Sequence, residues 1–375
     1  MKRSALVASA LVLTLLPPAS AVELEKNSID LVLASSSIQK SLTLGGNSRG
    51  PAIAVLNDDT VLLGGGRSGG ELFIWNQVRK SMVRAGSFIP SKARMFDSRF
   101  AINDIAILSQ SPTSARLLIS YPRLGASRSC VEVAVDELAL DRKRQKARFV
   151  SQWFVTSPCV PISAVQHTAG RFEVIDKNSV YVTIGDLGYS KIGNRSARGD
   201  LGSVFKLTAR SAEKISEGHR NPQGIVLYNK DTLLVSEHGP RGGDEINLVK
   251  KGNDYGWPFV SYGQPYGSGD YVRPTKTGTH AGYVEPITYW APSIAPTELV
   301  QLPKSGWGDW SNQLVLGTLR EQVLVFMAID ERFAVTNTVN VDIGERIRDL
   351  EVLSTGELVA TTDSGKLLVI NQKAS

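Results

Sequence analysis

Short apolar runs, each followed by a turn rich in Asp, Asn or Gly, dominate the pattern of hydrophobic and polar positions along the chain. In the first such unit an apolar run at 52–56 is followed by polar residues at 57–59, and then by runs at 61–63 and 72–75 that flank a glycine-rich turn. Runs of this length between turn residues predict β-strands, whereas the 3.6-residue spacing of helices is scarce.

This unit occurs six times along the chain. Its second strands are predicted to begin at residues 61, 117, 180, 233, 314 and 358. A loose repeat of strand–turn–strand units is typical of a β-propeller, in which each blade buries its faces against its neighbours. We therefore predict an all-β protein, a six-bladed β-propeller of four-stranded antiparallel blades. The alternative is an open β-sandwich, which would leave long sheet edges.

The ends and the spacing of the repeat predict the domain organisation. Residues 1–21 have the features of a signal peptide: Lys2 and Arg3, an apolar stretch at 5–16 and small residues at 19–21. Cleavage would leave a single propeller domain at 22–375 with no transmembrane segment, located in the periplasm or secreted; the alternative is an uncleaved anchor. The longest interval between units predicts an insertion at about 250–297.

Charge and cysteine content narrow the possible classes of function. The chain has 375 residues and a formal net charge of +6. Its basic residues are scattered, so we expect no nucleic-acid partner. Two cysteines exclude a disulfide scaffold and a Cys-rich zinc module. In an oxidising compartment Cys130 and Cys159 either pair, with a structural role, or remain two free thiols.

The densest candidate chemistry lies at 236–247 and 252–258. A Gly239-Pro240 turn has little side chain to shield its carbonyl oxygens, and Asp and Glu residues are close in sequence. Such oxygens suit a hard cation such as Ca²⁺. The alternative is a tight turn between blades with acidic residues on the surface.

Two further stretches contain hydrogen-bond donors and a candidate base. Arg220 and Asn221 offer a forked cation and an amide, which suit a carboxylate. His167 precedes one predicted strand and Asp186 follows the next, so antiparallel pairing would bring the imidazole and the carboxylate together. The alternative for Arg220 and Asn221 is a solvated loop in which the arginine forms an ion pair. The alternative for His167 is a histidine at the surface, or one whose hydrogen bonds are satisfied in the core.

Two more candidates come from the last third of the chain. Strand alternation places Arg346 and Arg348 on one face, where two guanidinium groups would bind a polyanion; the alternative is a pair of surface ion pairs. Trp290 lies in a proline-stiffened loop and offers an aromatic plate; the alternative is a buried packing residue.

Five phrases occur in order along the chain: GHRNPQG, SEHGPRGGDEIN, NDYGWP, WAPSIAP and ERIRDL. Together they resemble the glucose/sorbosone dehydrogenase family, the soluble aldose sugar dehydrogenases that use pyrroloquinoline quinone (PQQ). The resemblance is strong from about residue 166 to 370 and weak before 160. It implies a six-bladed propeller, in agreement with the repeat.

The resemblance also implies roles for the matching residues. His167 would be the general base, supported by Asp186, with Arg220 at the reacting oxygen. The residues implied to bind PQQ are Arg220, Asn221, Trp290, Arg320, Arg346 and Arg348. Those implied to bind Ca²⁺ are Gly239 and Pro240 for the cofactor's ion, and main-chain oxygens around Glu245 and Tyr255 for a second, structural ion.

The implied reaction is the oxidation of the C1 hydroxyl of an aldose to a lactone, with electrons passing to an unidentified acceptor, a quinone or a cytochrome. Gln166, Lys191 and Arg320 replace the family's Asp, Gln and Lys, which bears on substrate range. Two other functions remain open. One is a catalytically silent propeller that binds a glycan or a protein. The other is a calcium-dependent lactonase, which would direct acidic and Asn ligands into the central channel. In that case Arg346 and Arg348 would have no function in the site.

Overall fold

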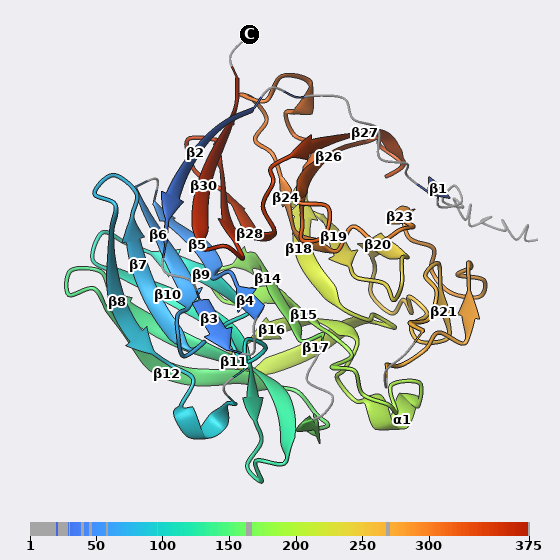
Figure 1. Ribbon diagram of the computed structural model, residues 1–375. Coiled ribbons are helices and arrows are strands. Elements are labelled where there is room, and N and C mark those ends of the chain that lie inside the picture. Colours follow the sequence, from blue (N-terminus) through green and yellow to red (C-terminus); the bar gives the residue numbers. More distant parts are fainter. Residues whose placement is uncertain are drawn as a thin grey trace, which may run out of the picture.

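The computed structural model describes residues 20–21, 29, 31–38, 41–44, 47–57, 59–95, 97–162, 167–267 and 271–373. Their strands form six antiparallel blades around a central axis (Figure 1). The predicted six-bladed β-propeller is thereby confirmed. None of the described helices is long and apolar enough to cross a membrane.

Four strands make each blade, with the first strand at the axis and the last on the outside. Blade 1 contains β5 (Ala52–Asn57), β6 (Thr60–Gly65), β7 (Glu71–Asn76) and β8 (Ser81–Ser87). Blade 2 contains β9 (Asp104–Gln110), β10 (Ser114–Leu124), β11 (Cys130–Asp141) and β12 (Lys146–Val155). Blade 3 contains β14 (Ala169–Asp176), β15 (Ser179–Ile184), β16 (Ser203–Thr208) and β17 (Ser211–Glu217).

The second half of the chain follows the same plan. Blade 4 contains β18 (Pro222–Tyr228), β19 (Thr232–Glu237), β20 (Asp244–Val249) and β23 (Thr288–Trp290). Blade 5 contains β24 (Pro296–Gln301), β25 (Leu314–Thr318), β26 (Val323–Ile329) and β27 (Val335–Asp342). Blade 6 contains β28 (Ile347–Val352), β29 (Leu358–Thr362), β30 (Lys366–Gln372) and β2 (Leu31–Ser37).

Blade 6 is built from both ends of the chain. Its outermost strand, β2, pairs antiparallel with β30 over seven residues, from Leu31 opposite Gln372 to Ser37 opposite Lys366. This pairing closes the ring of blades, and the repeat in the sequence did not reveal it. The predicted signal peptide lies outside the described residues except for β1 (Ser20–Ala21), which pairs with β23.

A long connection joins the third and fourth strands of blade 4. It runs through residues 250–287 and contains β21 (Val260–Ser261) and β22 (Lys276–Thr277), which pair with each other in parallel. The insertion predicted at 250–297 therefore includes β23, the outer strand of the blade. In blade 2, β13 (Val160–Pro161) pairs with β11, and Cys130 and Cys159 form a disulfide.

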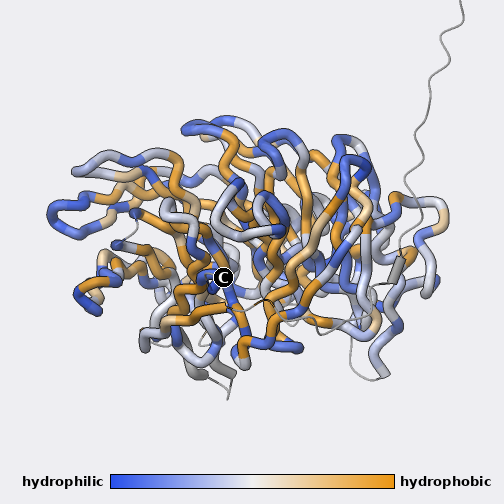
Figure 2. Tube along the Cα trace, turned by 90° about the horizontal axis from the view of Figure 1, so that it is seen from above, coloured by the Kyte–Doolittle hydropathy of each residue, from blue (hydrophilic) through white to orange (hydrophobic). Residues whose placement is uncertain are grey.

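Apolar side chains fill the spaces between adjacent blades. Among the described residues six hydrophobic clusters form, and each joins one neighbouring pair of blades around the ring. Figure 2 shows the hydrophobic residues along the strands and many hydrophilic ones in the loops at their ends. Strands that are buried on both faces explain the near-continuous apolar runs of the sequence.

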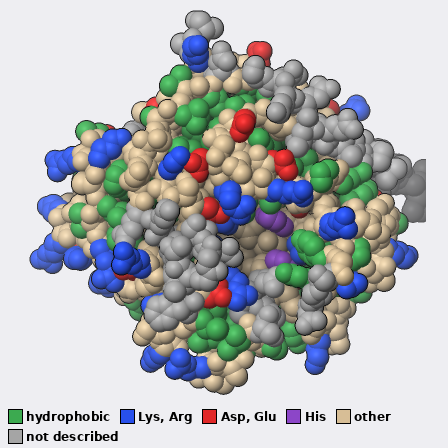
Figure 3. Space-filling view, viewed as in Figure 1, with side chains coloured by type: hydrophobic (Ala, Val, Ile, Leu, Met, Phe, Trp, Pro, Cys, Tyr) green, Lys and Arg blue, Asp and Glu red, His purple; other side chains and the backbone are tan. Residues whose placement is uncertain are grey.

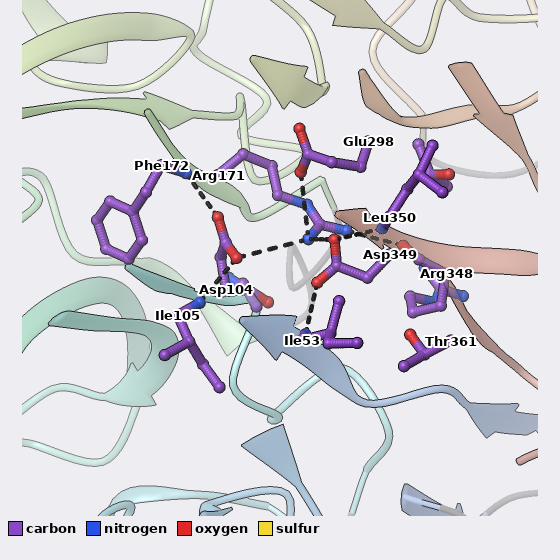
Figure 4. Close-up of polar contacts among 12 residues, drawn as sticks. Ile53, Asp104, Ile105, Arg171, Phe172, Glu298, Arg348, Asp349, Leu350 and Thr361 are labelled. Carbon is purple, nitrogen blue, oxygen red and sulfur yellow. Dashed lines mark hydrogen bonds and ion pairs between the residues drawn. The ribbon is translucent and has the colours of Figure 1, made fainter. Parts of the chain in front are cut away.

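A buried ionic cluster ties the inner strands together at the axis (Figure 4). Arg171, at the start of β14, is 1% exposed and directs Nη1 towards three carboxylates: Asp349 at 2.9 Å, Glu298 at 3.5 Å and Asp104 at 3.9 Å. Its Nη2 donates to the carbonyl oxygen of Arg348 at 2.9 Å. One guanidinium group thus joins blades 2, 3, 5 and 6.

Each of these carboxylates also bonds the main chain of a neighbouring inner strand. Asp104 accepts from the amide of Phe172, Glu298 from that of Ile225, and Asp349 from that of Ile53. Together these bonds join blade 2 to 3, blade 5 to 4 and blade 6 to 1. Buried charges are stable only when paired and hydrogen-bonded in this way.

The cluster holds more carboxyl groups than cations. Burial and the neighbouring Asp349 together raise the pKa of Asp104 to about 8. Burial also raises the pKa of Asp349 and Glu298. Beyond the cluster, the later residues of the inner strands line a cavity of about 670 Å³.

Replacing Arg171 tests this cluster. Arg171→Met would leave three buried carboxyl groups without their cation, so we expect the free energy of unfolding to fall by about 3–5 kcal/mol. Arg84→Met is the matched control, because it removes the half-exposed Arg84–Glu71 ion pair and should cost about 1 kcal/mol or less. Urea denaturation measures both, and equal losses would contradict the role given to Arg171.

Candidate active site

The candidate site lies where the inner strands begin. In an antiparallel pair the start of the inner strand faces the end of the second strand, and the register shows this in three blades: Ala169 opposite Ile184, Pro222 opposite Glu237 and Ile347 opposite Thr362. The residues flanking these pairs therefore meet at one end of the axis. Figure 3 shows a hollow there, with histidine side chains in it and charged side chains around it.

His167 and Asp186 form the predicted pair. The imidazole Nδ1 lies 2.8 Å from Asp186 Oδ1. Asp186 is fully buried and also accepts hydrogen bonds from the indole of Trp257 at 2.8 Å and the amide of Gly188 at 2.7 Å. A carboxylate accepts hydrogen bonds, so Nδ1 carries the proton and Nε2 is left with its lone pair directed away from Asp186.

Gly185 explains why the base and its carboxylate come together. A Cβ atom at Gly185 would lie 1.7 Å from the carbonyl oxygen of His167. Only glycine allows this approach between the loop that carries the base and the end of β15. His167 itself has a φ of 52°, an uncommon conformation for a residue with a side chain.

The surroundings keep the imidazole neutral. Burial lowers the pKa of His167, and the positive charge of Arg220 lowers it further, while Asp186 acts in the opposite direction. Burial would raise the pKa of Asp186, but His167, Arg220 and the amide of Gly188 outweigh it and lower that pKa. At neutral pH the site therefore presents a neutral base beside an ionised carboxylate.

Arg220 connects the base to the carbonyl oxygens of the 238–239 segment. Its Nη2 lies 3.2 Å from His167 Nε2, and its Nη1 donates to the carbonyl oxygen of Gly239 and, at 3.1 Å, to that of His238. The guanidinium carbon is 5.3 Å from the ring centroid of Trp257. Glu237, which immediately precedes the 238–239 segment, accepts hydrogen bonds from the main-chain amide of Arg220 and from the imidazole of His219. These bonds hold the two chain segments next to each other.

The two predicted arginines of blade 6 share one carboxylate. Arg346 Nε lies 2.9 Å from Asp363 Oδ2, and Arg348 donates to both oxygens of Asp363 at 2.9 Å. Arg348 is tied to the strand that follows His167, because its carbonyl oxygen accepts from Arg171 Nη2 at 2.9 Å. Burial lowers the pKa of His238 to about 3, and Arg220, His167 and Arg348 all contribute to the decrease.

The other residues predicted to bind the cofactor lie in different environments. The Asn221 carbonyl accepts from the amide of His238, which keeps Asn221 beside the site. Trp290 is 1% exposed and packs in the core between blades 4 and 5, so the structure gives it a packing role. Arg320 is 58% exposed and lies 3.5 Å from Glu321. Gln166 lies outside the described residues.

The residues predicted for metal binding fall into two groups. The carbonyl of Gly239 faces Arg220, and that of Pro240 accepts from the hydroxyl of Tyr266 at 3.3 Å. Glu245 and Tyr255 are buried. The Glu245 carboxylate accepts from His280 at 2.8 Å, so its side chain already has a partner.

Several residues of the site were not predicted, among them Arg49, Asn103, Trp257 and Asp363. The repeat would have pointed to Asp363, because it follows the second strand of its blade just as Asp186 does. Trp257 stands inside the NDYGWP phrase, but its bond to Asp186 requires the fold.

Comparison with known proteins identifies the family. The glucose/sorbosone dehydrogenase family model matches residues 50–369, and the chain belongs to this family. An aldose sugar dehydrogenase of Escherichia coli is 28% identical over 325 residues, which cover 81% of this chain and 85% of the relative. Quinoprotein glucose dehydrogenase B of Acinetobacter calcoaceticus is 29% identical over 130 residues, 26% of this chain and 27% of that protein.

Solved structures share the fold. The soluble aldose sugar dehydrogenase of Escherichia coli, in its apo form, has a TM-score of 0.74 at 25% identity, covering 91% of this chain and 100% of that one. The PQQ-bound aldose sugar dehydrogenase of Streptomyces coelicolor has a TM-score of 0.67 at 17% identity, covering 92% and 99%.

Gly185 provides a test of the site's construction. In Gly185→Ala the new methyl group would push the His167 loop away from Asp186, so we expect activity to fall at least about 100-fold and stability to fall by about 1–3 kcal/mol. Gly267→Ala is the control, since among the described residues no atom beyond its chain neighbours lies within 4 Å of its added Cβ. Kinetics and denaturation of both variants check this, and equal behaviour would contradict the close approach.

Proposed function

We propose that this protein is a sugar dehydrogenase that oxidises the C1 hydroxyl of an aldose to a lactone, using PQQ and Ca²⁺. The observation that carries the proposal is the lone pair of His167 Nε2, which faces a cationic pocket while Asp186 fixes the other side of the ring. The family membership and the aldose sugar dehydrogenase of Escherichia coli support the substrate class.

The pocket fits a planar cofactor that carries several carboxylates. Arg346 and Arg348 share the single carboxylate of Asp363, so their charge is only partly neutralised. Arg220 adds a third guanidinium group near the base. Arginine binds carboxylates with two parallel hydrogen bonds, which suits these groups to hold such a cofactor.

The same region fits a hard cation. The carbonyl oxygens of His238 and Gly239 converge on one nitrogen of the Arg220 guanidinium group, so they point at a single position where a cation would replace that nitrogen as their partner. Main-chain oxygens are ligands that Ca²⁺ prefers. We propose that Gly239 and Pro240 provide the calcium ligands, and a second, structural ion at the main-chain oxygens of Glu245 and Tyr255 stays a prediction.

The residues then divide the chemistry between them. His167 Nε2 accepts the proton of the sugar's C1 hydroxyl, and Asp186 stabilises the imidazolium that forms. Arg220 stabilises negative charge that develops beside the base. When bound, the quinone would supply the two-electron acceptor for the hydride of C1.

The same observations favour the two alternative functions, a lactonase and a silent binding propeller, less than they favour a dehydrogenase. A calcium-dependent lactonase would use acidic ligands at the centre of the channel, but the guanidinium group of Arg171 lies among those carboxylates. A silent binding propeller would not need a base whose tautomer is fixed. We further propose that the protein is exported and passes its electrons to a quinone or a cytochrome.

Reconstitution tests the proposal. The purified protein with PQQ and Ca²⁺ should reduce a dye in the presence of an aldose from a panel of sugars. His167→Ala should lower the rate at least about 100-fold while still binding the quinone, because the histidine serves the proton transfer. Quinone binding without turnover would favour the silent propeller, and hydrolysis of lactones without PQQ would favour the lactonase.

The pH dependence tests the pair formed by His167 and Asp186. The neutral imidazole is the active form, and burial and Arg220 hold its pKa below the ordinary value for histidine, so kcat/KM should be retained at neutral pH and lost as the pH falls through that lowered pKa. Asp186→Asn removes the charge that raises this pKa. We therefore expect the acid limb to move to lower pH and the rate to fall about 10²- to 10⁴-fold.

Asp176→Asn is the matched control for this measurement. It changes an exposed carboxylate at the far end of β14, the strand that follows His167. Its pH profile should match that of the unmodified protein. An acid limb that does not move in Asp186→Asn would show that His167 is not the titrating base.

A further inference from the structure

Arg49 stands at the mouth of the site, from the part of the chain with the weakest resemblance to the family. It ends β4 (Asn47–Arg49), three residues before the inner strand β5 begins. Its Nη2 donates to Asn103 Oδ1 at 3.0 Å, and the same oxygen accepts from the hydroxyl of Thr168 at 3.3 Å. Thr168 follows the base His167, so Arg49 reaches the loop that carries the base.

Arg49 also lies beside the arginine pair of blade 6. The amide of Gly50 donates to Asp363 Oδ1 at 2.8 Å, and a Cβ atom at Gly50 would lie only 2.8 Å from the Cβ of Arg348. The main chain that carries Arg49 is therefore pressed against the residues that hold Arg346 and Arg348. The segment before blade 1 and the start of blade 6 thus bring Arg49, Arg346 and Arg348 close together.

These cations are held close together against their mutual repulsion. Burial and the charges of Arg348 and Arg171 together lower the pKa of Arg49 to about 9, against the opposing effect of Asp363 and Asp349. Asp363 already serves both Arg346 and Arg348. A bound polyanion would relieve this repulsion, since like charges in a partly buried site disfavour the charged state.

Arg320, which the family pattern puts forward as a further cofactor ligand, is placed differently. Its side chain is 58% exposed and lies against Glu321. Arg49 is half-buried and lies between the loop of the base and the arginine pair. Of the two, Arg49 is the one whose position suits a carboxylate bound in the hollow.

We propose that Arg49 binds a carboxylate of the quinone cofactor alongside Arg346 and Arg348, in place of Arg320. This inference rests on the proposed function, because it takes PQQ as the anion of the site. It gives the segment that precedes the first blade a direct part in binding. It also predicts that affinity depends on Arg49 before any sugar is present.

Equilibrium binding of PQQ tests the inference without relying on turnover. With Ca²⁺ in excess and no sugar, tryptophan fluorescence or calorimetry gives Kd for the unmodified protein, Arg49→Gln, Arg49→Lys and Arg320→Gln. Loss of a hydrogen bond between two charged groups should raise Kd about 10-fold or more in Arg49→Gln. Arg49→Lys keeps the charge and should be intermediate, and Arg320→Gln should stay within about 2-fold of the unmodified protein.

PQQ with its carboxylates esterified separates binding from a structural role. If Arg49 acts on a carboxylate, Arg49→Gln should bind the ester as well as the unmodified protein does. Equal Kd values for PQQ in the two proteins, or equal weakening for PQQ and its ester, would overturn the inference. Absence of PQQ binding by the unmodified protein would instead overturn the proposed function, and the inference with it.

Thermal melting of each variant checks its folding, and Arg49→Lys replaces Arg49→Gln if the latter does not fold.

Discussion

The ionic cluster around Arg171 holds the inner strands of the blades in their positions around the axis. A propeller brings the starts of six inner strands to one axis, where main-chain groups and side chains must be satisfied without water. In this protein three carboxylates bond the amides of neighbouring inner strands, and one guanidinium group joins the three. The geometry of the axis is thereby determined by a few polar groups, while the apolar clusters between the blades supply the bulk of the burial.

This cluster is bonded to the candidate site. Arg171 is four positions after His167 in the chain, and its Nη2 donates to the carbonyl oxygen of Arg348. The proposed base and one of the arginines proposed to bind the cofactor are therefore attached to the same cluster from two different blades. Precise placement of catalytic groups requires such a second layer of packing and hydrogen bonds.

The sequence predicted the repeat and several of the motifs, and missed the contacts that depend on closure of the ring. Apolar runs between turn residues identified the strands because a blade strand buried on both faces has a strong local pattern. The pairing of His167 with Asp186 was predictable because antiparallel neighbours bring a strand's start to its neighbour's end. By contrast, the pairing of β2 with β30 joins the two ends of the chain, and Arg171 meets partners from three other blades. The loop pattern at Trp290 does not distinguish an aromatic plate from a core residue, and its packing between blades 4 and 5 is seen only in the fold.

We propose that His167, Arg220 and the arginines of blade 6 surround one pocket that holds the quinone together with its calcium ion. A crystal structure of the protein with PQQ and Ca²⁺ would show whether this is so. We expect the cofactor in the hollow at the start of the inner strands, with its carboxylates on Arg346 and Arg348 and His167 Nε2 facing the space left for the sugar. Density for the quinone elsewhere on the propeller, with His167 still bonded to Arg220, would contradict it.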